Sequence, residues 1–314
     1  MLTDIVWLCF LYLIHVFTRS LSCHKSTLLT HEQPQLIWRG TDFGFLGFIT
    51  PTLSQPDPIK IVRRHLSEND KDADKDDVRR NAIQALNEQI DTLVPRWKGV
   101  ALTADAELQV EGTDDLPWAN IKFSSYNWKG KKPTIGSLRY EPWESVDIAV
   151  GEGMSPSELA KYKYHIDLGG GGGTTWGGTI EKLSMPGLLY HHMTPTKDYI
   201  HDYLTPWKHY IPVSENLQDL KKKFDWAEAH PQEAKRIADA GTDYMRELGT
   251  PQGFGKLYED VFVEPLKRVI EAYQPVSTTH PDKTWRDMLN DNVLSVNPIM
   301  ECDGLVDLID CKKL

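Results

Sequence analysis

Lys161–Leu183 (KYKYHIDLGGGGGTTWGGTIEKL) is the stretch that decides the fold of this chain. Residues 163–168 (KYHIDL) predict a strand, and residues 179–183 (TIEKL) predict a helix. Five consecutive glycines, 169–173, separate the two. Each glycine inside a regular element costs about 0.5–1 kcal/mol relative to alanine. Five in a row therefore predict a loop whose backbone, rather than its side chains, is used.

A glycine loop that leaves a strand and enters a helix can turn its N–H groups toward an anion. The P-loop motif does not fit, because Thr174, Thr175 and Trp176 follow the glycines where that motif requires lysine. The dinucleotide pattern G-x-G-x-x-G has no strict match either. What remains is a loop of N–H groups, two threonine hydroxyls and a helix start, which fits a diphosphate. The alternative is a purely structural glycine hinge.

The residues after the loop complete a strand–helix–strand unit. Pro186 and Gly187 end the short helix, and residues 188–192 (LLYHH) predict a second strand. Such a unit implies a parallel sheet, so we expect an α/β fold that is Rossmann-like, with helices on both faces. Apolar spacing predicts three further helices, at residues 215–229, 231–248 and 255–273, the last with Val261, Phe262, Leu266, Val269, Ile270 and Tyr273 facing inward.

Upstream, residues 34–50 predict a buried strand followed by a glycine-containing turn. Residues 78–94 predict an amphipathic helix that Pro95 ends, and residues 100–160 read as loops and short strands. Ser155 followed by Pro156 predicts the start of a short helix. We expect four regions: a leader and linker (1–33), a remnant of an N-terminal half with a connection (34–160), a nucleotide-binding half with its helices (161–275) and an irregular tail (276–314).

The composition excludes several classes of function. The formal net charge of −10 disfavours general binding to nucleic-acid backbones. The four cysteines lack metal-ligand spacing, so a structural zinc site is not expected. The triplet Asp70-Lys71-Asp72 lies in a charge run, residues 68–77, without a flanking apolar strand, and the run is interpreted as a solvated loop or the start of a helix.

Residues 5–17 (IVWLCFLYLIHVF) form an apolar run near the N-terminus. At 1.5 Å per residue a helix of this length spans about 20 Å, short of a hydrocarbon core of about 30 Å. The length suits a secretory signal or a short anchor, with membrane association through this run, and the alternatives are a buried helix or a mispredicted exon. We therefore expect the endoplasmic reticulum, the Golgi or secretion.

Polar and aromatic residues gather at the end of the second predicted strand and at residues 207–213. His191 and His192 end the second strand, but adjacent strand residues face opposite ways, so a shared metal site is not expected. Residues 207–213 (WKHYIPV) predict a strand whose start rims a cleft. His209 is open to two interpretations, a ligand contact or a structural histidine.

Three stretches together resemble glycosyltransferase family 90, which includes capsule-associated xylosyltransferases and protein O-glucosyltransferases. The first is residues 161–164 with the glycine loop, and the second is residues 206–213 (PWKHYIPV) with the helix that begins at Leu217. The third is Trp38-Arg39-Gly40-Thr41, similar to an aromatic-Arg-Gly-Ser/Thr motif of the family. The resemblance covers residues 35 to 273.

The resemblance implies a GT-B-type architecture of two Rossmann-like halves, with a UDP-sugar on the C-terminal half. It implies inverting transfer of glucose or xylose to a protein or glycan hydroxyl, without a metal or any cofactor beyond the UDP-sugar co-substrate. We expect a nucleotide-sugar site made of Arg39, Gly169, Gly170, Gly171, Gly172, Gly173, Thr174, Thr175, Thr179 and Lys182, with Trp207, His209 and Tyr210 at the cleft rim.

The chain departs from the family pattern in two ways. The family has a phosphate-binding arginine near the position of Thr179, and the extra backbone N–H groups of the longer loop are expected to replace it. The family's catalytic aspartate lies well upstream of the Arg-Gly motif, where this sequence has only the apolar leader, and Asp42 is the nearest carboxylate. No catalytic residue is therefore assigned. We expect a truncated N-terminal half, and a catalytically dead nucleotide-sugar-binding protein is the alternative function.

Overall fold

The computed structural model describes residues 33–41, 45, 61, 74–125, 148, 151–175, 177–273 and 287. The apolar leader, the Asp70-Lys71-Asp72 triplet, the four cysteines and Asp42 lie outside these residues, whereas the end of the charge run, Asp74–Asp77, caps and begins the helix α3 (Lys75–Glu88). The chain divides into two compact units, residues 1–250 and 251–314, and each is considered by itself.

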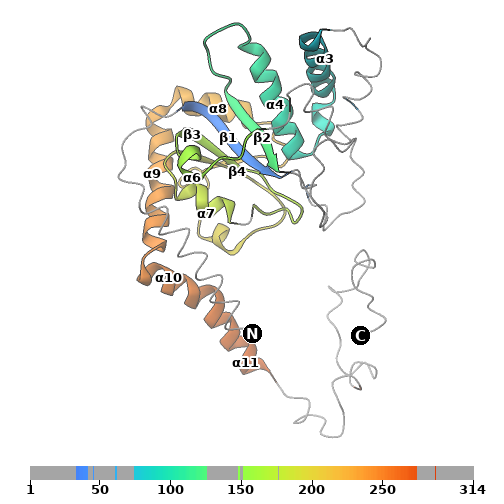
Figure 1. Cartoon of the computed structure of the whole chain (residues 1–314). Coiled ribbons are helices and arrows are strands. Elements are labelled where there is room, and N and C mark those ends of the chain that lie inside the picture. The colour runs from blue at the N-terminus through green and yellow to red at the C-terminus, as the bar shows by residue number, and fades with distance from the viewer. Residues whose placement is uncertain are drawn as a thin grey trace. The chain divides into compact units, whose positions relative to one another are not determined.

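The first unit is built on a parallel sheet of five strands in the order β2-β1-β3-β4-β5 (Figure 1). The expected α/β class with a Rossmann-like sheet is confirmed. Residues 34–160 were expected to form a region distinct from the nucleotide-binding half. β1 and β2 come from this region, yet they share one sheet with β3. The strands are β1 (Gln33–Thr41), β2 (Ala119–Ser125), β3 (Tyr162–Asp167), β4 (Leu188–His192) and β5 (Ile211–Val213).

Helices lie on both faces of the sheet. Leu36 of β1 is the register partner of Tyr164 in β3, so both side chains share one face, and Phe224 of α8 packs on Tyr164 there. Asp167 lies on the opposite face, because it is an odd number of residues from Tyr164, and there it bonds Thr179 of α7. The helices of this unit are α3 (Lys75–Glu88), α4 (Pro95–Gln109), α6 (Pro156–Leu159), α7 (Gly178–Leu183), α8 (Leu220–Ala229) and α9 (Pro231–Leu248), with 3-10 turns η1 (Ile90–Thr92) and η2 (Tyr199–Asp202).

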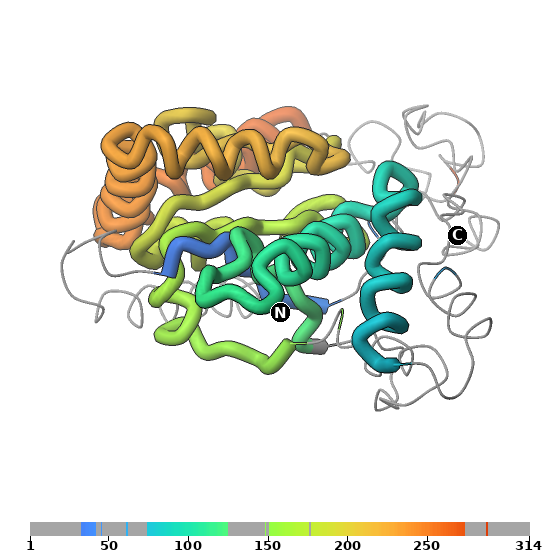
Figure 2. Tube along the Cα trace, turned by 90° about the horizontal axis from the view of Figure 1, so that it is seen from above, coloured from blue at the N-terminus to red at the C-terminus, as the bar shows by residue number. Residues whose placement is uncertain are grey.

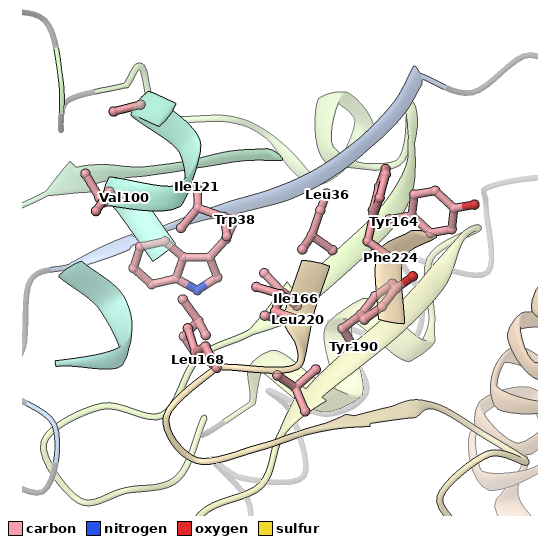
Figure 3. Close-up of a cluster of buried hydrophobic side chains, with 14 of the residues drawn as sticks. Leu36, Trp38, Val100, Ile121, Tyr164, Ile166, Leu168, Tyr190, Leu220 and Phe224 are labelled. Carbon is pink, nitrogen blue, oxygen red and sulfur yellow. The ribbon is translucent and has the colours of Figure 1, made fainter. Parts of the chain in front are cut away.

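The hydrophobic core fills the face that α4 and α8 cover. Figure 3 shows Trp38 and Ile121 from neighbouring strands beside Val100 of α4, and Tyr164 beside Phe224. Trp38 meets the ring of Phe123 edge-on at 5.9 Å. Burying large apolar side chains of this kind contributes about 1.5–3 kcal/mol each, which fixes β1 as an internal strand.

Pro95 begins α4, so the prediction of loops and short strands for residues 100–160 was wrong for residues 100–109. Proline is well suited to the first turn of a helix, where its missing N–H would have no partner. The buried face of α4 carries small residues such as Ala101 and Ala104. These give a weak apolar periodicity, which is why the helix escaped detection. Figure 2 shows α3 beside α4, and the two helices are packed together.

The second unit contains α10 (Pro251–Tyr258), the π-helical turn η3 (Glu259–Val263) and α11 (Glu264–Ala272). The apolar residues predicted to face a core are not buried: Ile270 is 63% exposed and Tyr273 is 68% exposed. Leu266 and Val269 are exposed as well. The periodicity identified an apolar face correctly, but periodicity does not show whether anything covers that face.

Candidate functional site at the carboxyl edge of the sheet

The glycine loop lies at the edge where the parallel strands end. The strand order reverses between β1 and β3, because β2 is added on one side of β1 and β4 on the other side of β3. In open α/β sheets, ligands bind beside the carboxyl ends of the strands at such a reversal. The loop follows β3 directly, so the topology places it beside this crevice.

Three of the five loop N–H groups are used within the fold. Gly169 donates to Nδ1 of His192 at 3.1 Å, and Gly170 donates to the carbonyl of Thr174 at 3.0 Å. Gly173 donates to the carbonyl of Gly170 at 2.9 Å, which closes a turn. The expected loop of N–H donors is therefore only partly open. Among the described residues, the loop N–H groups that bond nothing are those of Gly171 and Gly172.

Three positions of the loop require glycine for different reasons. A Cβ on Gly169 would lie 2.4 Å from the carbonyl oxygen of Gly173, which is a severe clash with backbone. A Cβ on Gly170 would lie 2.9 Å from Nη2 of Arg96. Gly173 has a φ of +84°, which favours glycine strongly. Gly172 has no atom within 4 Å of its Cβ position, so that part of the loop faces open space.

Arg96, in the first turn of α4, bridges the two strands at the reversal point. Its Nη1 donates to the carbonyl of Thr41 at the end of β1 at 2.5 Å, and its Nη2 donates to the carbonyl of Leu168 at 2.9 Å. The guanidinium also lies 5.2 Å from the ring of Trp38. Sequence reasoning missed this residue. A positive charge at a helix N-terminus is unfavourable for the helix dipole, and this unfavourable placement was the sequence signal that could have identified Arg96.

Asp167 ends β3 and is the most heavily bonded side chain of the site. It is 1% exposed and accepts hydrogen bonds from the Thr179 hydroxyl at 2.6 Å and from the backbone N–H of His192 at 3.1 Å. Nδ1 of His191 lies 2.9 Å from each carboxylate oxygen. Burial alone would raise the pKa of Asp167, but the charge and hydrogen bonds of His191 lower that pKa to about 2.

His191 and His192 serve different roles because they face opposite sides of β4. Burial opposes the charged form of His191, but Asp167 outweighs burial and raises the pKa of His191. His192 accepts from Gly169 through Nδ1 and donates through Nε2 to the carbonyl of Glu215 at 2.7 Å. This pattern fixes the neutral Nε2–H tautomer, and burial lowers the pKa of His192 to about 4. His192 therefore anchors the first loop residue.

The threonines are divided between the loop and the interior. Thr179 is fully buried, and its hydroxyl donates to Asp167, so the Thr175 hydroxyl donates to Thr179 over 2.6 Å. This chain of hydroxyls fastens the far end of the glycine loop to β3. Thr174 accepts from Gly170 through its carbonyl and interacts through its side chain with Asp198, whose Oδ2 is buried without a hydrogen-bond partner among the described residues.

Lys182 and Arg39 occupy different parts of the unit. The ammonium of Lys182 reaches back along α7 to 3.5 Å from the carbonyl of Gly178, and burial lowers its pKa. Arg39, on β1, bonds Asn120 of β2 and not the glycine loop. Its guanidinium donates to the carbonyls of Trp38, Asn120 and Glu152, and to the Asn120 side chain, over 2.8–3.1 Å.

The three residues expected at a cleft rim lie in different environments. His209 is buried, its Nδ1 accepts from the backbone N–H of Thr205 at 2.9 Å, and its ring stacks on Tyr244. These contacts favour the structural interpretation of His209. Tyr210 is also buried, with its ring 5.0 Å from that of His191. Trp207 is 41% exposed and adopts a φ of +62°.

Comparison with known proteins finds matches to the segment that contains most of this site. Residues 143–250 match the model described as glycosyl transferase family 90. Protein O-glucosyltransferase 2 of Danio rerio is 36% identical over 95 residues, which cover 28% of this chain and 17% of that protein. Protein O-glucosyltransferase 3 is 34% identical over 100 residues in Rattus norvegicus and 31% identical over 117 residues in Homo sapiens. These matches cover 30% and 35% of this chain, and 18% and 22% of the relatives.

The chain thus spans about a fifth of the length of these curated relatives. The matched segment begins before β3 and continues through the glycine loop, α7, β4, β5, α8 and α9. The resemblance inferred from the sequence is therefore confirmed over residues 143–250, which contain the glycine loop and residues 206–213 and match the glycosyl transferase family 90 model. The Trp38–Thr41 motif lies outside the matched residues.

Proposed function

We propose that this protein is a glycosyltransferase that moves a sugar from a UDP-sugar, of the glucose or xylose type, to a hydroxyl of a protein or glycan. The observation that carries the proposal is the family 90 match over residues 143–250, which contain the whole carboxyl-edge site after β3. The similarity to protein O-glucosyltransferases 2 and 3 favours a glucosyl donor and a protein acceptor. Transfer with inversion, without a metal ion or a further cofactor, completes the proposal.

The geometry of the loop supports a diphosphate as the ligand. The N–H groups of Gly171 and Gly172 make no hydrogen bond to described residues, and a Cβ on Gly172 would meet only open space. A hydrogen bond from such a donor to a charged oxygen contributes about 1.5–3 kcal/mol. The buried Oδ2 of Asp198 adds an acceptor suited to a hydroxyl of the ligand.

The test begins with calorimetric titration of UDP into the full chain. Turnover of UDP-glucose and UDP-xylose, with a hydroxyl acceptor and in the presence of EDTA, then follows. We expect UDP binding and sugar release or transfer that EDTA does not abolish. An absence of UDP binding would overturn the proposal. Activity that EDTA removes and a divalent cation restores would overturn its metal-independent part.

A second candidate is a protein that binds a nucleotide sugar without transferring it. Asp167 is the carboxylate that β3 delivers to the loop, and its oxygens are already occupied by Thr179, His191 and the backbone of His192. With a pKa lowered to about 2, Asp167 is too weak a base to activate an acceptor hydroxyl. UDP binding without turnover of either donor would favour this candidate.

We also propose that the protein acts in the secretory pathway. The apolar run at residues 5–17 supports this location as a signal or an anchor. Among the helices the structure describes, none has the length and apolar character needed to cross a bilayer. Attaching residues 1–33 to a reporter protein and following its secretion tests the location, and retention of the reporter in the cytosol would contradict it.

A further inference from the structure

The side chain of His191 is oriented by one ring nitrogen and leaves the other available. Asp167 and His191 are register partners on adjacent strands. Nδ1 lies 2.9 Å from both carboxylate oxygens and must carry a proton, because an ionised carboxylate only accepts. Nε2 makes no hydrogen bond with any residue in the described part of the chain. The pair therefore presents a fixed Nε2 at the carboxyl edge of the sheet.

The ring of His191 lies where the connections after β3 and β4 meet. Its centroid is 4.4 Å from that of His201, in the turn after β4, and 5.0 Å from that of Tyr210, just before β5. Through Asp167 and Thr179 it is linked to Thr175 of the glycine loop. The charged and titratable groups around it are Asp167 on β3, Lys182 on α7, His192 on β4, Asp198 and His201 at η2, and Tyr210 before β5.

The surroundings favour the imidazolium form of His191. Asp167 and Asp198 favour its positive charge, and together they outweigh the opposing effect of burial, so the pKa of His191 is raised. His201 has its pKa lowered to about 4, by burial first and then by the charge of His191, so it stays neutral near pH 7. A cation with an N–H donor at this edge matches an anionic oxygen, because charge-assisted hydrogen bonds are about twice as strong as neutral ones.

We propose that His191, held in place by Asp167, donates a hydrogen bond from Nε2 to a diphosphate oxygen of the bound nucleotide. This inference rests on the proposed function and deepens it, because it assigns the cationic group of the site to β4. His191 is the contacting residue in this scheme. Asp167 is a positioning residue that acts through the histidine ring.

The experiment is calorimetric titration of UDP into the full chain at pH 6.0, 7.0 and 8.5, with His191→Gln compared with wild type. The ratio of the two affinities removes the effect of UDP ionisation. We expect His191→Gln to bind UDP about 10- to 100-fold more weakly at pH 6.0, and this ratio to shrink as the pH rises and His191 loses its proton. The matched control is His230→Gln, because His230 is exposed at the end of α8. The ratio of the UDP affinities of His230→Gln and wild type should stay near one at each pH.

Two further measurements separate contact from structure. Nuclear magnetic resonance titration of the wild-type chain should show that the pKa of His191 rises when UDP binds. Asp167→Asn should lower that pKa and move the fall in UDP affinity to lower pH. Wild type that binds no UDP would overturn the proposed function and this inference together. Three outcomes with UDP still bound would overturn the inference alone. They are an affinity ratio near one, an affinity ratio that is constant with pH, and a His191 pKa that UDP leaves unchanged.

Discussion

The contact between Gly170 and Arg96 gives a sharp test of how the glycine loop is held. In Gly170→Ala the new methyl group would lie 2.9 Å from Nη2 and 3.4 Å from Cζ of Arg96. The guanidinium must move, and its hydrogen bond to the Leu168 carbonyl is the contact most exposed to loss. Gly172→Ala is the matched control in the same loop, since its methyl group would meet no atom within 4 Å.

The expected magnitude follows from these contacts. A hydrogen bond to a charged group contributes about 1.5–3 kcal/mol. Where the native backbone conformation is compatible, replacing glycine by alanine raises the free energy of unfolding by about 0.4–1 kcal/mol, because alanine reduces the conformational entropy of the unfolded chain. Gly170→Ala should therefore lower the free energy of unfolding by about 1–2 kcal/mol, whereas Gly172→Ala should change it little or raise it slightly.

Urea unfolding followed by far-ultraviolet circular dichroism measures the difference, and calorimetry with UDP measures its effect on the loop. Gly170→Ala should weaken UDP binding more than Gly172→Ala. If the two variants unfold with free energies within about 0.5 kcal/mol of each other and bind UDP equally, Arg96 does not hold the loop as described.

Three other outcomes are expected. Thr179→Val removes a buried hydroxyl bonded to Asp167 and should cost about 1–3 kcal/mol in urea unfolding, while Thr179→Ser should recover most of the loss. Burial lowers the pKa of His165 and of His192 to about 4. The contribution of the two neutral side chains to the free energy of unfolding is therefore full above pH 6.5 and is lost as the pH falls toward 4. A urea midpoint that stays constant over that range would contradict this prediction. Gly241→Ala would place a methyl group 2.6 Å from the His209 carbonyl and should destabilise by about 1–3 kcal/mol, whereas Gly255→Ala, with open space around it, should stabilise its helix by about 0.5–1 kcal/mol in thermal unfolding.

The local order of elements around the glycine loop was predictable because each element carries its own signal. The strand before the loop, the helix after it and the next strand all appear where the sequence placed them. Glycine and proline mark their ends, and these residues act through backbone geometry that depends little on the rest of the fold. The strand that contains Arg39 was predicted for the same reason.

The chemistry of the site was less accessible, because it depends on which strands become neighbours. Asp167 and His191 are 24 residues apart, and only the parallel register of β3 and β4 brings them together. Arg96 is 72 residues from Leu168 and comes from a helix that was not predicted. The use of loop N–H groups by His192 and Thr174 also follows from tertiary contacts, so the number of free donors could not be read from the glycines.

The central position of β1 has a consequence for how the chain is made. β1 leaves the ribosome before β3, and Leu36 pairs in register with Tyr164, a separation of 128 residues. At roughly 5–20 residues per second, β1 waits about 6–25 s for this partner strand to be synthesised. During that time Leu36, Ile37 and Trp38, all buried in the folded protein, remain without their final neighbours. The nascent chain is therefore expected to need chaperone protection during this interval, and its folding should be slow, as for other proteins dominated by long-range strand pairing.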